Sequence, residues 1–210
     1  MIVTLKNKNL NMKHVQIKTL AFCFLAATSF AMLSCGGSEE NKTTEDTSAM
    51  HTDSTVIPVA NVTHAEAIIA GTKADTTVDG KITFDTAGGK VKMMLDIAVP
   101  KLANKSVAVH IHEHPDCGDN GNASHGHWNP THSKHGKWGV DSFHLGDIGN
   151  VKLNAEGKGT MELSTDLWTL GSDTLSSVLN RALIVHSGVD DYKTQPTGNA
   201  GSRIGCGVIK

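Results

Sequence analysis

Histidine is concentrated in one stretch of this chain, residues 107–147. Eight of the twelve histidines lie there, namely His110, His112, His114, His125, His127, His132, His135 and His144. Imidazole nitrogens are common ligands for zinc and copper in proteins. Because the charged fraction of the chain, 19%, is ordinary, the local excess of histidine indicates a metal site.

The first two of these histidines lie in a segment with the period of a β-strand. Val107, Val109 and Ile111 alternate with positions that include His110 and His112. Alternate side chains of a strand point to the same side, so the two imidazoles can bind one ion. A long loop rich in Gly, Asn, Ser and His follows the strand. A loop of this length is usually functional or disordered, and metal ligands spread along it would order it.

Six short motifs follow one another from the first of these histidines onward. They are His110-Ile-His112-Glu113, His127-Trp-Asn-Pro130, Lys134-His135-Gly136, His144-Leu-Gly-Asp147-Ile-Gly-Asn150, Ile184-Val-His186 and Gly198-Asn-Ala-Gly-Ser-Arg203-Ile-Gly-Cys206-Gly-Val-Ile209. Taken together, and in this order, they resemble the copper/zinc superoxide dismutases over roughly residues 62–210. Each motif alone is weak, and their shared order makes the match specific.

The resemblance implies two neighbouring metal ions and an enzyme that converts superoxide and protons into dioxygen and hydrogen peroxide. The implied copper ligands are His110, His112, His127 and His186. The implied zinc ligands are His127, His135, His144 and Asp147, which would complete a tetrahedral shell. In this family the shared histidine, His127, bridges the ions and takes up a proton when its bond to copper breaks.

Three further roles follow from the same resemblance. Arg203 would lie beside copper and attract the anionic substrate, since a guanidinium is always charged. Asp190 would link a copper ligand to a zinc ligand and fix their tautomers, with Asp191 as the alternative. Cys117 and Cys206 would form a disulfide, as expected in an oxidising compartment. The alternative for the two cysteines is a pair of buried free thiols.

Three histidines of the loop have no role in the motifs: His114, His125 and His132. They are expected to be solvated loop residues, and the alternative is an auxiliary site that captures metal. His125 lies two residues before His127 and competes with it for the bridging position. The Trp-Asn-Pro sequence that follows His127 selects the latter.

The first 35 residues are predicted to be an export signal. Four lysines and no acidic residue precede an apolar segment, residues 19–33, which is too short to span a membrane comfortably. The signal ends in Met32-Leu-Ser-Cys35-Gly, which resembles a bacterial lipobox, so Cys35 would carry lipid and begin the mature chain. An ordinary signal peptide and a start at Met12 are the alternatives. The predicted location is the bacterial cell envelope, as a membrane-anchored lipoprotein.

Residues 36–61 are predicted to be a flexible acidic tether, because they are rich in Ser, Thr, Asp and Glu and nearly lack apolar side chains. His51 in this segment could contact metal. All 21 acidic residues but only 15 of the 19 basic ones follow Cys35, so the mature chain has a net charge of −6. This charge does not favour nucleic acid as a partner.

Residues 62–210 show short apolar segments separated by glycine turns, with almost no helical period. Strands are expected at residues 63–70, 81–85, 91–99, 107–113, 149–154, 159–165, 181–186 and 205–209. Eight such strands predict an all-β, Greek-key, Ig-like antiparallel sandwich or barrel. Residues 174–180 would form at most a short turn of helix. Two long functional loops are expected at residues 113–143 and 187–202.

Two other kinds of protein were weighed against the enzyme. A metal-binding module of the same fold could store or deliver copper or zinc, but the complete ligand sets together with Arg203 favour the enzyme. A purely structural surface lipoprotein would leave the order of the histidines unexplained. Pairing of two chains into a homodimer stays open, because members of the family pair through different surfaces.

Overall fold

The computed structural model describes residues 62–173 and 175–210. The predicted export signal, Cys35 and the tether lie outside the described residues. Within the described ranges, no helix has the length and apolar character that crossing a membrane requires.

The described residues form an eight-stranded sheet in which every strand pair is antiparallel. The strands are β1 (His64–Gly71), β2 (Asp79–Ala87), β3 (Lys90–Ala98), β4 (Ser106–His112), β5 (Gly149–Lys152), β6 (Lys158–Thr165), β7 (Ala182–His186) and β8 (Arg203–Val208). Their order in the sheet is β5-β4-β7-β8-β1-β2-β3-β6. The sheet curls into a nearly closed barrel, which confirms the all-β prediction.

Small differences from the sequence-based prediction concern helical turns and strand lengths. Strand β2 is longer than expected at both ends. Two 3₁₀ segments that were not expected are η1 (Pro100–Leu102) and η2 (Asp119–Ser124). No helix forms in the described part of residues 174–180, where an isolated bridge joins Ser177 to Thr169.

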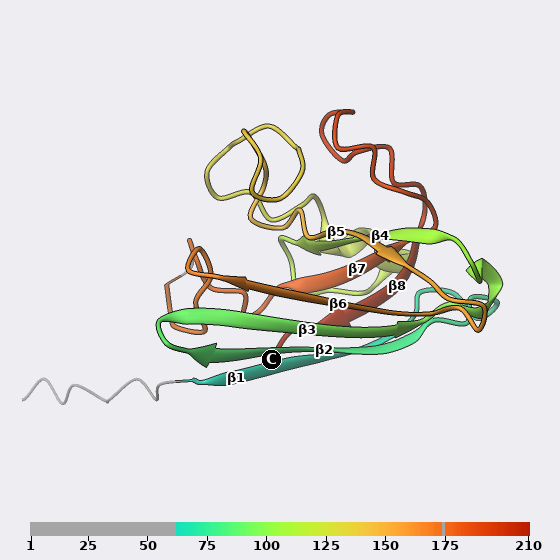
Figure 1. The fold of residues 1–210 in the computed structure, drawn as a ribbon, viewed down its shortest axis with the longest axis horizontal. Helices are drawn as coiled ribbons and strands as arrows, with labels where there is room; N and C mark the ends of the chain where they lie inside the picture. Colours follow the sequence, from blue (N-terminus) through green and yellow to red (C-terminus); the bar gives the residue numbers. More distant parts are fainter. Residues whose placement is uncertain (1–61, 174) are drawn as a thin grey trace, which may run out of the picture. The chain divides into compact units, whose positions relative to one another are not determined.

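The core forms because apolar side chains alternate along the strands. In β3, Val91, Met93, Leu95 and Ile97 are each at most 3% exposed, whereas the residues between them are partly or fully exposed. Burying one such side chain contributes on the order of 1.5–3 kcal/mol. The two long loops, coloured yellow and red in Figure 1, project beyond β4 and β5 on one side of the sheet.

Strand β4 carries the first two predicted metal ligands. Every residue from Val107 to His112 is buried. Val107, Val109 and Ile111 belong to the core, and alternation turns His110 and His112 to the opposite side, beneath the loops. Burial on both faces explains why this strand lacks exposed polar residues.

Strands β7 and β8 bring two more predicted site residues next to β4. Ile184 of β7 pairs with His110, and the last residue of β7, His186, pairs with Arg203 of β8. The register shifts between Val185 and His186. Pairing between strands far apart in the sequence therefore places His186 and Arg203 near the β4 histidines.

The predicted disulfide is confirmed. Cys117 and Cys206, 89 residues apart in the sequence, are bonded. Both cysteines pack against Ala182 and Ile184 on the outside of β7 and β8. The bond thereby ties the beginning of the first long loop to the last strand.

Replacing both cysteines, Cys117→Ser/Cys206→Ser, is expected to destabilise the protein. Closing a loop of this length stabilises the fold by about 4.6 kcal/mol in the chain-entropy model. The Tm should fall further in the chelator-treated protein than in the metal-loaded one, because a bound ion orders the same loop. Calorimetry of both forms measures this, and an equal fall in both would contradict it.

Candidate metal centre

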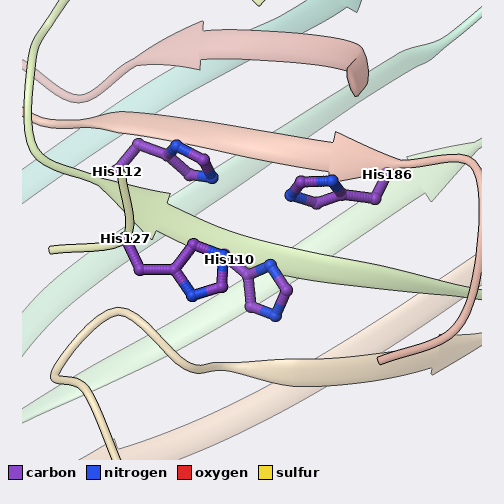
Figure 2. A group of neighbouring side chains, drawn as sticks. All are labelled: His110, His112, His127 and His186. Atoms are coloured by element: carbon purple, nitrogen blue, oxygen red, sulfur yellow. The ribbon is translucent and has the colours of Figure 1, made fainter. Parts of the chain in front are cut away.

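Four buried histidines converge at the ends of β4 and β7. His110, His112, His127 and His186 are each at most 4% exposed, and one ring nitrogen of each lies within 4.8 Å of the others. Figure 2 shows His110 and His112 on β4, His186 at the end of β7, and His127 on the loop. A set of four imidazoles around one small space suits copper or zinc.

The loop backbone places His127 in this group. An isolated antiparallel bridge pairs His127 with His112, and Trp128 donates its N–H to the carbonyl of Ile111 at 2.8 Å. The N–H of Ile111 in turn donates to the carbonyl of Gly146 at 2.9 Å. A Cβ at Gly146 would lie 2.1 Å from the Ile111 oxygen, so only glycine permits this close approach.

A second buried group shares His127 with the first. It consists of His127, His135, His144 and Asp147, again with one ligand atom of each within 4.8 Å of the others. The carboxylate of Asp147 lies 2.8 Å, 3.0 Å and 3.2 Å from the Nδ1 atoms of the three histidines. Three imidazoles and one carboxylate form a closed tetrahedral set of the kind that zinc prefers.

The hydrogen bonds of the first group leave one nitrogen of each ring without a partner. Among the described residues, His110 Nδ1 and the Nε2 atoms of His112, His127 and His186 are buried and have no hydrogen-bond partner. A buried polar atom without a partner costs about 1–3 kcal/mol. Four such atoms facing one space therefore fit a bound ion.

The second group also contains buried ring nitrogens without hydrogen-bond partners. Nδ1 of His135 and Nδ1 of His144 are also buried and lack a partner with hydrogen-bond geometry, although both lie near Asp147. Their other nitrogens are occupied: His144 Nε2 donates to the carbonyl of Ser133 at 3.1 Å, and His135 Nε2 donates to Asp190. Each ring thus keeps one nitrogen for an ion and uses the other for orientation.

Asp190 connects the two groups. Its carboxylate accepts a hydrogen bond from His110 Nε2 at 2.9 Å and another from His135 Nε2 at 2.9 Å. The alternative residue, Asp191, is exposed, and its carboxylate accepts from Lys193 and Thr194 instead. Of the two carboxylates, the one that touches both histidine groups is therefore that of Asp190.

Sequence reasoning gave no role to three residues that hold this arrangement. The side-chain amide of Asn150 bonds both backbone groups of Asp190 at 2.9 Å and the hydroxyl of Tyr192 at 2.9 Å. Gln195 bonds both backbone groups of His135, each at 2.9 Å. Asn150 stands at the end of a recognised motif, but nothing in the local sequence marks Gln195.

Arg203 fastens the loop beside the first group. Its guanidinium donates to the carbonyl of Gly121 at 2.7 Å, to Ser124 Oγ at 2.9 Å and to the carbonyl of His125 at 2.7 Å. The same His125 carbonyl accepts a hydrogen bond from His112 Nδ1 at 2.8 Å. Arg203 is half-buried and therefore supplies both a fixed positive charge and a structural anchor.

Burial lowers the pKa of three histidines of the first group, His112, His127 and His186. Burial lowers the pKa of His127 to about 4, although the hydrogen bond to Asp147 opposes it. Burial lowers the pKa of His186 to about 3. A neutral ring has a free lone pair for a metal ion.

The pKa values of Asp147 and His135 shift in the directions expected for an ion pair. Although burial alone would raise it, the close contacts of the carboxylate with the rings of His127, His135 and His144 hold the pKa of Asp147 far below its ordinary value. Burial lowers the pKa of His135, but the close contact with Asp147 and the hydrogen bond to Asp190 outweigh burial and raise the pKa to about 9. An ion bound through His135 Nδ1 would replace a proton.

The metal-free protein is expected to lose stability in acid. The unfolded rings of His127 and His186 bind protons near pH 6.5, but the folded rings do so only near pH 4 and 3. The unfolded state therefore binds more protons as the pH falls below 6.5, which costs about 2 kcal/mol for each ring by pH 4.5. Urea unfolding of chelator-treated protein at pH 7 and 4.5 measures the difference. An unchanged midpoint would contradict the expectation.

The three histidines without a motif role lie outside both buried groups. His114, His125 and His132 are exposed. The rings of His114 and His125 are stacked, with centroids 4.1 Å apart. His132 lines a pocket together with Glu113, His114 and Arg181.

The fold and the paired histidine groups define an all-β metalloprotein, and comparisons with known proteins narrow the class. Residues 78–209 match the family model described as "Copper/zinc superoxide dismutase (SODC)". Superoxide dismutase [Cu-Zn] 2 of Aquifex aeolicus is 33% identical over 151 residues, which cover 70% of this chain and 85% of that protein. The extracellular superoxide dismutase [Cu-Zn] of Caenorhabditis elegans is 34% identical over 143 residues, which cover 65% of this chain and 63% of that protein.

A solved structure has a similar fold. This chain is similar to the protein in the structure described as "Crystal Structure Analysis of the clock protein EA4", with a TM-score of 0.61 and 32% sequence identity. The matched region covers 70% of this chain and 93% of that one. This chain belongs to the copper/zinc superoxide dismutase family. It is an oxidoreductase that uses copper and zinc.

Proposed function

We propose that this protein disproportionates superoxide at the first histidine group, turning two superoxide anions and two protons into dioxygen and hydrogen peroxide. One observation carries the proposal: two groups of buried imidazole nitrogens that lack hydrogen-bond partners share a single histidine, His127. Membership in the family supports the same reaction.

The two groups are assigned to different metals by their donor atoms. The four imidazoles of His110, His112, His127 and His186 would hold copper. The second group, His127, His135, His144 and Asp147, would hold zinc, because three imidazoles and one carboxylate complete a tetrahedron. Copper, when bound, can cycle between two oxidation states, and so can take an electron from one superoxide and give it to another.

The protein contributes proton transfer and orientation. The Nε2 atom of His127 has no partner in the described structure, and burial keeps the ring neutral at pH 7. This nitrogen can hold a proton and pass it to the reduced substrate. The other nitrogen of the ring lies 2.8 Å from Asp147, and these two groups would share the zinc ion, while Asp190 sets the tautomers of His110 and His135.

Arg203 supplies the attraction for the anionic substrate. Burial of the first group is nearly complete, so a charge close by acts through little water. The charge of Arg203 is felt by His112 and His186, where it adds to burial in lowering both pKa values. A positive charge in this position offsets the net negative charge of the chain for an approaching anion.

Metal content and dismutating rate, measured on one purified, tag-free sample, test the function. The expected result is one copper and one zinc per chain. Removal of copper should abolish the activity, and copper alone should restore it while zinc stays bound. A sample that holds both metals and does not consume superoxide faster than buffer would refute the proposal.

We infer further that the protein is exported and anchored by lipid on Cys35. The apolar segment and the lipobox-like Met32-Leu-Ser-Cys35 support this, and the extracellular relative supports export. Changing Cys35→Ala should move the protein from the membrane to the soluble fraction with an unchanged dismutating rate. Membrane fractionation measures the shift, and a Cys35→Ala protein that stays fully membrane-bound would exclude the anchor.

A further inference from the structure

A third group of metal-binding side chains lies outside the two buried groups. Glu113, His114 and His125 each offer a ligand atom, and these atoms lie within 4.8 Å of one another. The rings of His114 and His125 stack almost in parallel, at an interplanar angle of 6°. All three side chains reach solvent, so an ion could enter without opening the fold.

The backbone around this group is firmly held. The N–H of Glu113 donates to the carbonyl of Gly126, and the N–H of His114 donates to the carbonyl of Ser124, both at 3.1 Å. These bonds continue the line of β4 beyond His112 and lay the loop against it. The two histidines are therefore placed opposite each other by strand-like pairing, and do not depend on a chance approach of loops.

His125 adopts a backbone conformation that a side chain rarely accepts. Its φ is 62° and its ψ is −142°, a region populated almost only by glycine, where other residues cost about 1–3 kcal/mol. The conformation is kept because the His125 carbonyl accepts hydrogen bonds from His112 and Arg203. These bonds fix the direction in which the imidazole leaves the backbone, toward His114.

The side chains of the group have lone pairs to offer. In the described part of the chain, no hydrogen bond engages a ring nitrogen of His114 or His125. Glu113 feels the positive charge of Arg181, whose guanidinium donates to the Glu113 carbonyl at 2.9 Å. The oxygens of this carboxylate can coordinate an ion, while the cation restrains the backbone on its other side.

The donor set selects the kind of ion. Two imidazoles and one carboxylate suit zinc or copper(II), and calcium or magnesium would need more oxygen ligands. Among divalent first-row ions a nitrogen and oxygen site binds copper(II) most tightly. Three ligands and an open side predict weaker binding and faster exchange than in either buried group.

We propose that Glu113, His114 and His125 form a third, solvent-exposed site for a divalent transition-metal ion, with copper(II) preferred over zinc. The site is distinct from the buried centre because none of its side chains belongs to either buried group. The hydrogen bond from His112 Nδ1 to the His125 carbonyl joins it to that centre.

The test uses full-length protein in which copper and zinc already fill the buried groups. Copper(II) sulfate is titrated in, and the bound metal is measured by elemental analysis after rapid desalting and by electron paramagnetic resonance. The unmodified protein should bind one further copper(II) ion, with a spectrum showing two nitrogen ligands. Zinc chloride should compete for the same ion position at higher concentration.

Two variants and a control locate the site. His114→Ala should weaken binding of the extra ion at least about tenfold. Losing a residue that only supports a metal ligand already costs that much, and His114 would be a ligand itself. Adding His125→Gly should abolish it, and glycine suits the unusual backbone conformation at that position. The control, His64→Ala, removes an exposed histidine of β1 that lies outside the group, and this variant should bind like the unmodified protein.

Three results would overturn the proposal: no third ion in the unmodified protein, an unchanged affinity in the double variant, or an equal loss in the control. The copper and zinc of the buried groups and the dismutating rate are measured on the same samples. Both should be unchanged in His114→Ala and in the control, which leave the His125 backbone that holds His112 and Arg203 in place. A failure of the third site thus leaves the proposed dismutase reaction untouched, and the converse also holds.

Discussion

Changing His186→Ala should abolish dismutation while zinc stays bound. His186 contributes one of the four imidazoles of the first group and none to the second. Its removal leaves three ligands and an opening where the fourth nitrogen stood. The rate should fall at least about 100-fold, because losing a residue that only supports a metal ligand already costs about 10- to 100-fold. Elemental analysis should find copper far below one per chain and zinc close to one. Superoxide consumption on the same sample gives the rate.

The matched variant is Asp147→Ala, which removes a ligand of the second group only. Zinc should be lost first, and the loop should loosen, because Asp147 also accepts hydrogen bonds from the backbones of Gly136 and His144. Activity should persist in part as long as copper stays bound. If both variants lose both metals equally, the assignment of two separate sites is wrong.

Changing Arg203→Glu should slow the reaction of superoxide by about 10- to 1000-fold, the range over which charge steering acts. The substitution replaces a positive charge beside the first group with a negative one, and the substrate is an anion. The rate of the unmodified protein should also fall as salt rises from 0.01 to 0.15 M, because the screening length shortens from about 30 Å to about 8 Å. In Arg203→Glu this salt dependence should vanish or reverse.

Controls separate the charge of Arg203 from its anchoring of the loop. Arg203→Lys keeps the charge but loses the fork that reaches Gly121, Ser124 and His125. It should lower the Tm while largely keeping the salt dependence and most of the rate. Lys193→Ala, at an exposed position, should have a smaller effect than either. An unaltered rate in Arg203→Glu would remove the steering role.

Local sequence determined the elements that carry the site. Alternation of apolar residues predicted strand β4 and the shared side of His110 and His112, because side-chain direction in a strand depends only on the parity of the position. The same reasoning located all eight strands and the two long loops. Strand ends were less certain: β2 extends beyond the predicted segment because pairing with both β1 and β3 continues past its apolar residues.

The order of the motifs suggested which distant residues form the metal centre, and the fold shows how these residues come together. Nothing local in the sequence brings Asp190 to His110, 80 residues away, or distinguishes it from its neighbour Asp191. That choice depends on how residues 187–202 fold back over β4. The contacts of Gln195 with His135 arise in the same way and have no signal in the local sequence.

The tertiary structure also decided where His114 and His125, the histidines without a role in the motifs, lie. By spacing, His125 rivals His127, and His114 follows directly after the β4 segment. The bridge between His112 and His127 and the pairing of residues 113–114 with 124–126 send His127 into the buried centre and His125 outward, to stack on His114. Sequence determines the residue types and their alternation along a strand, but backbone pairing between segments determines which imidazoles share an ion, because coordination requires donor atoms to meet within a few ångströms.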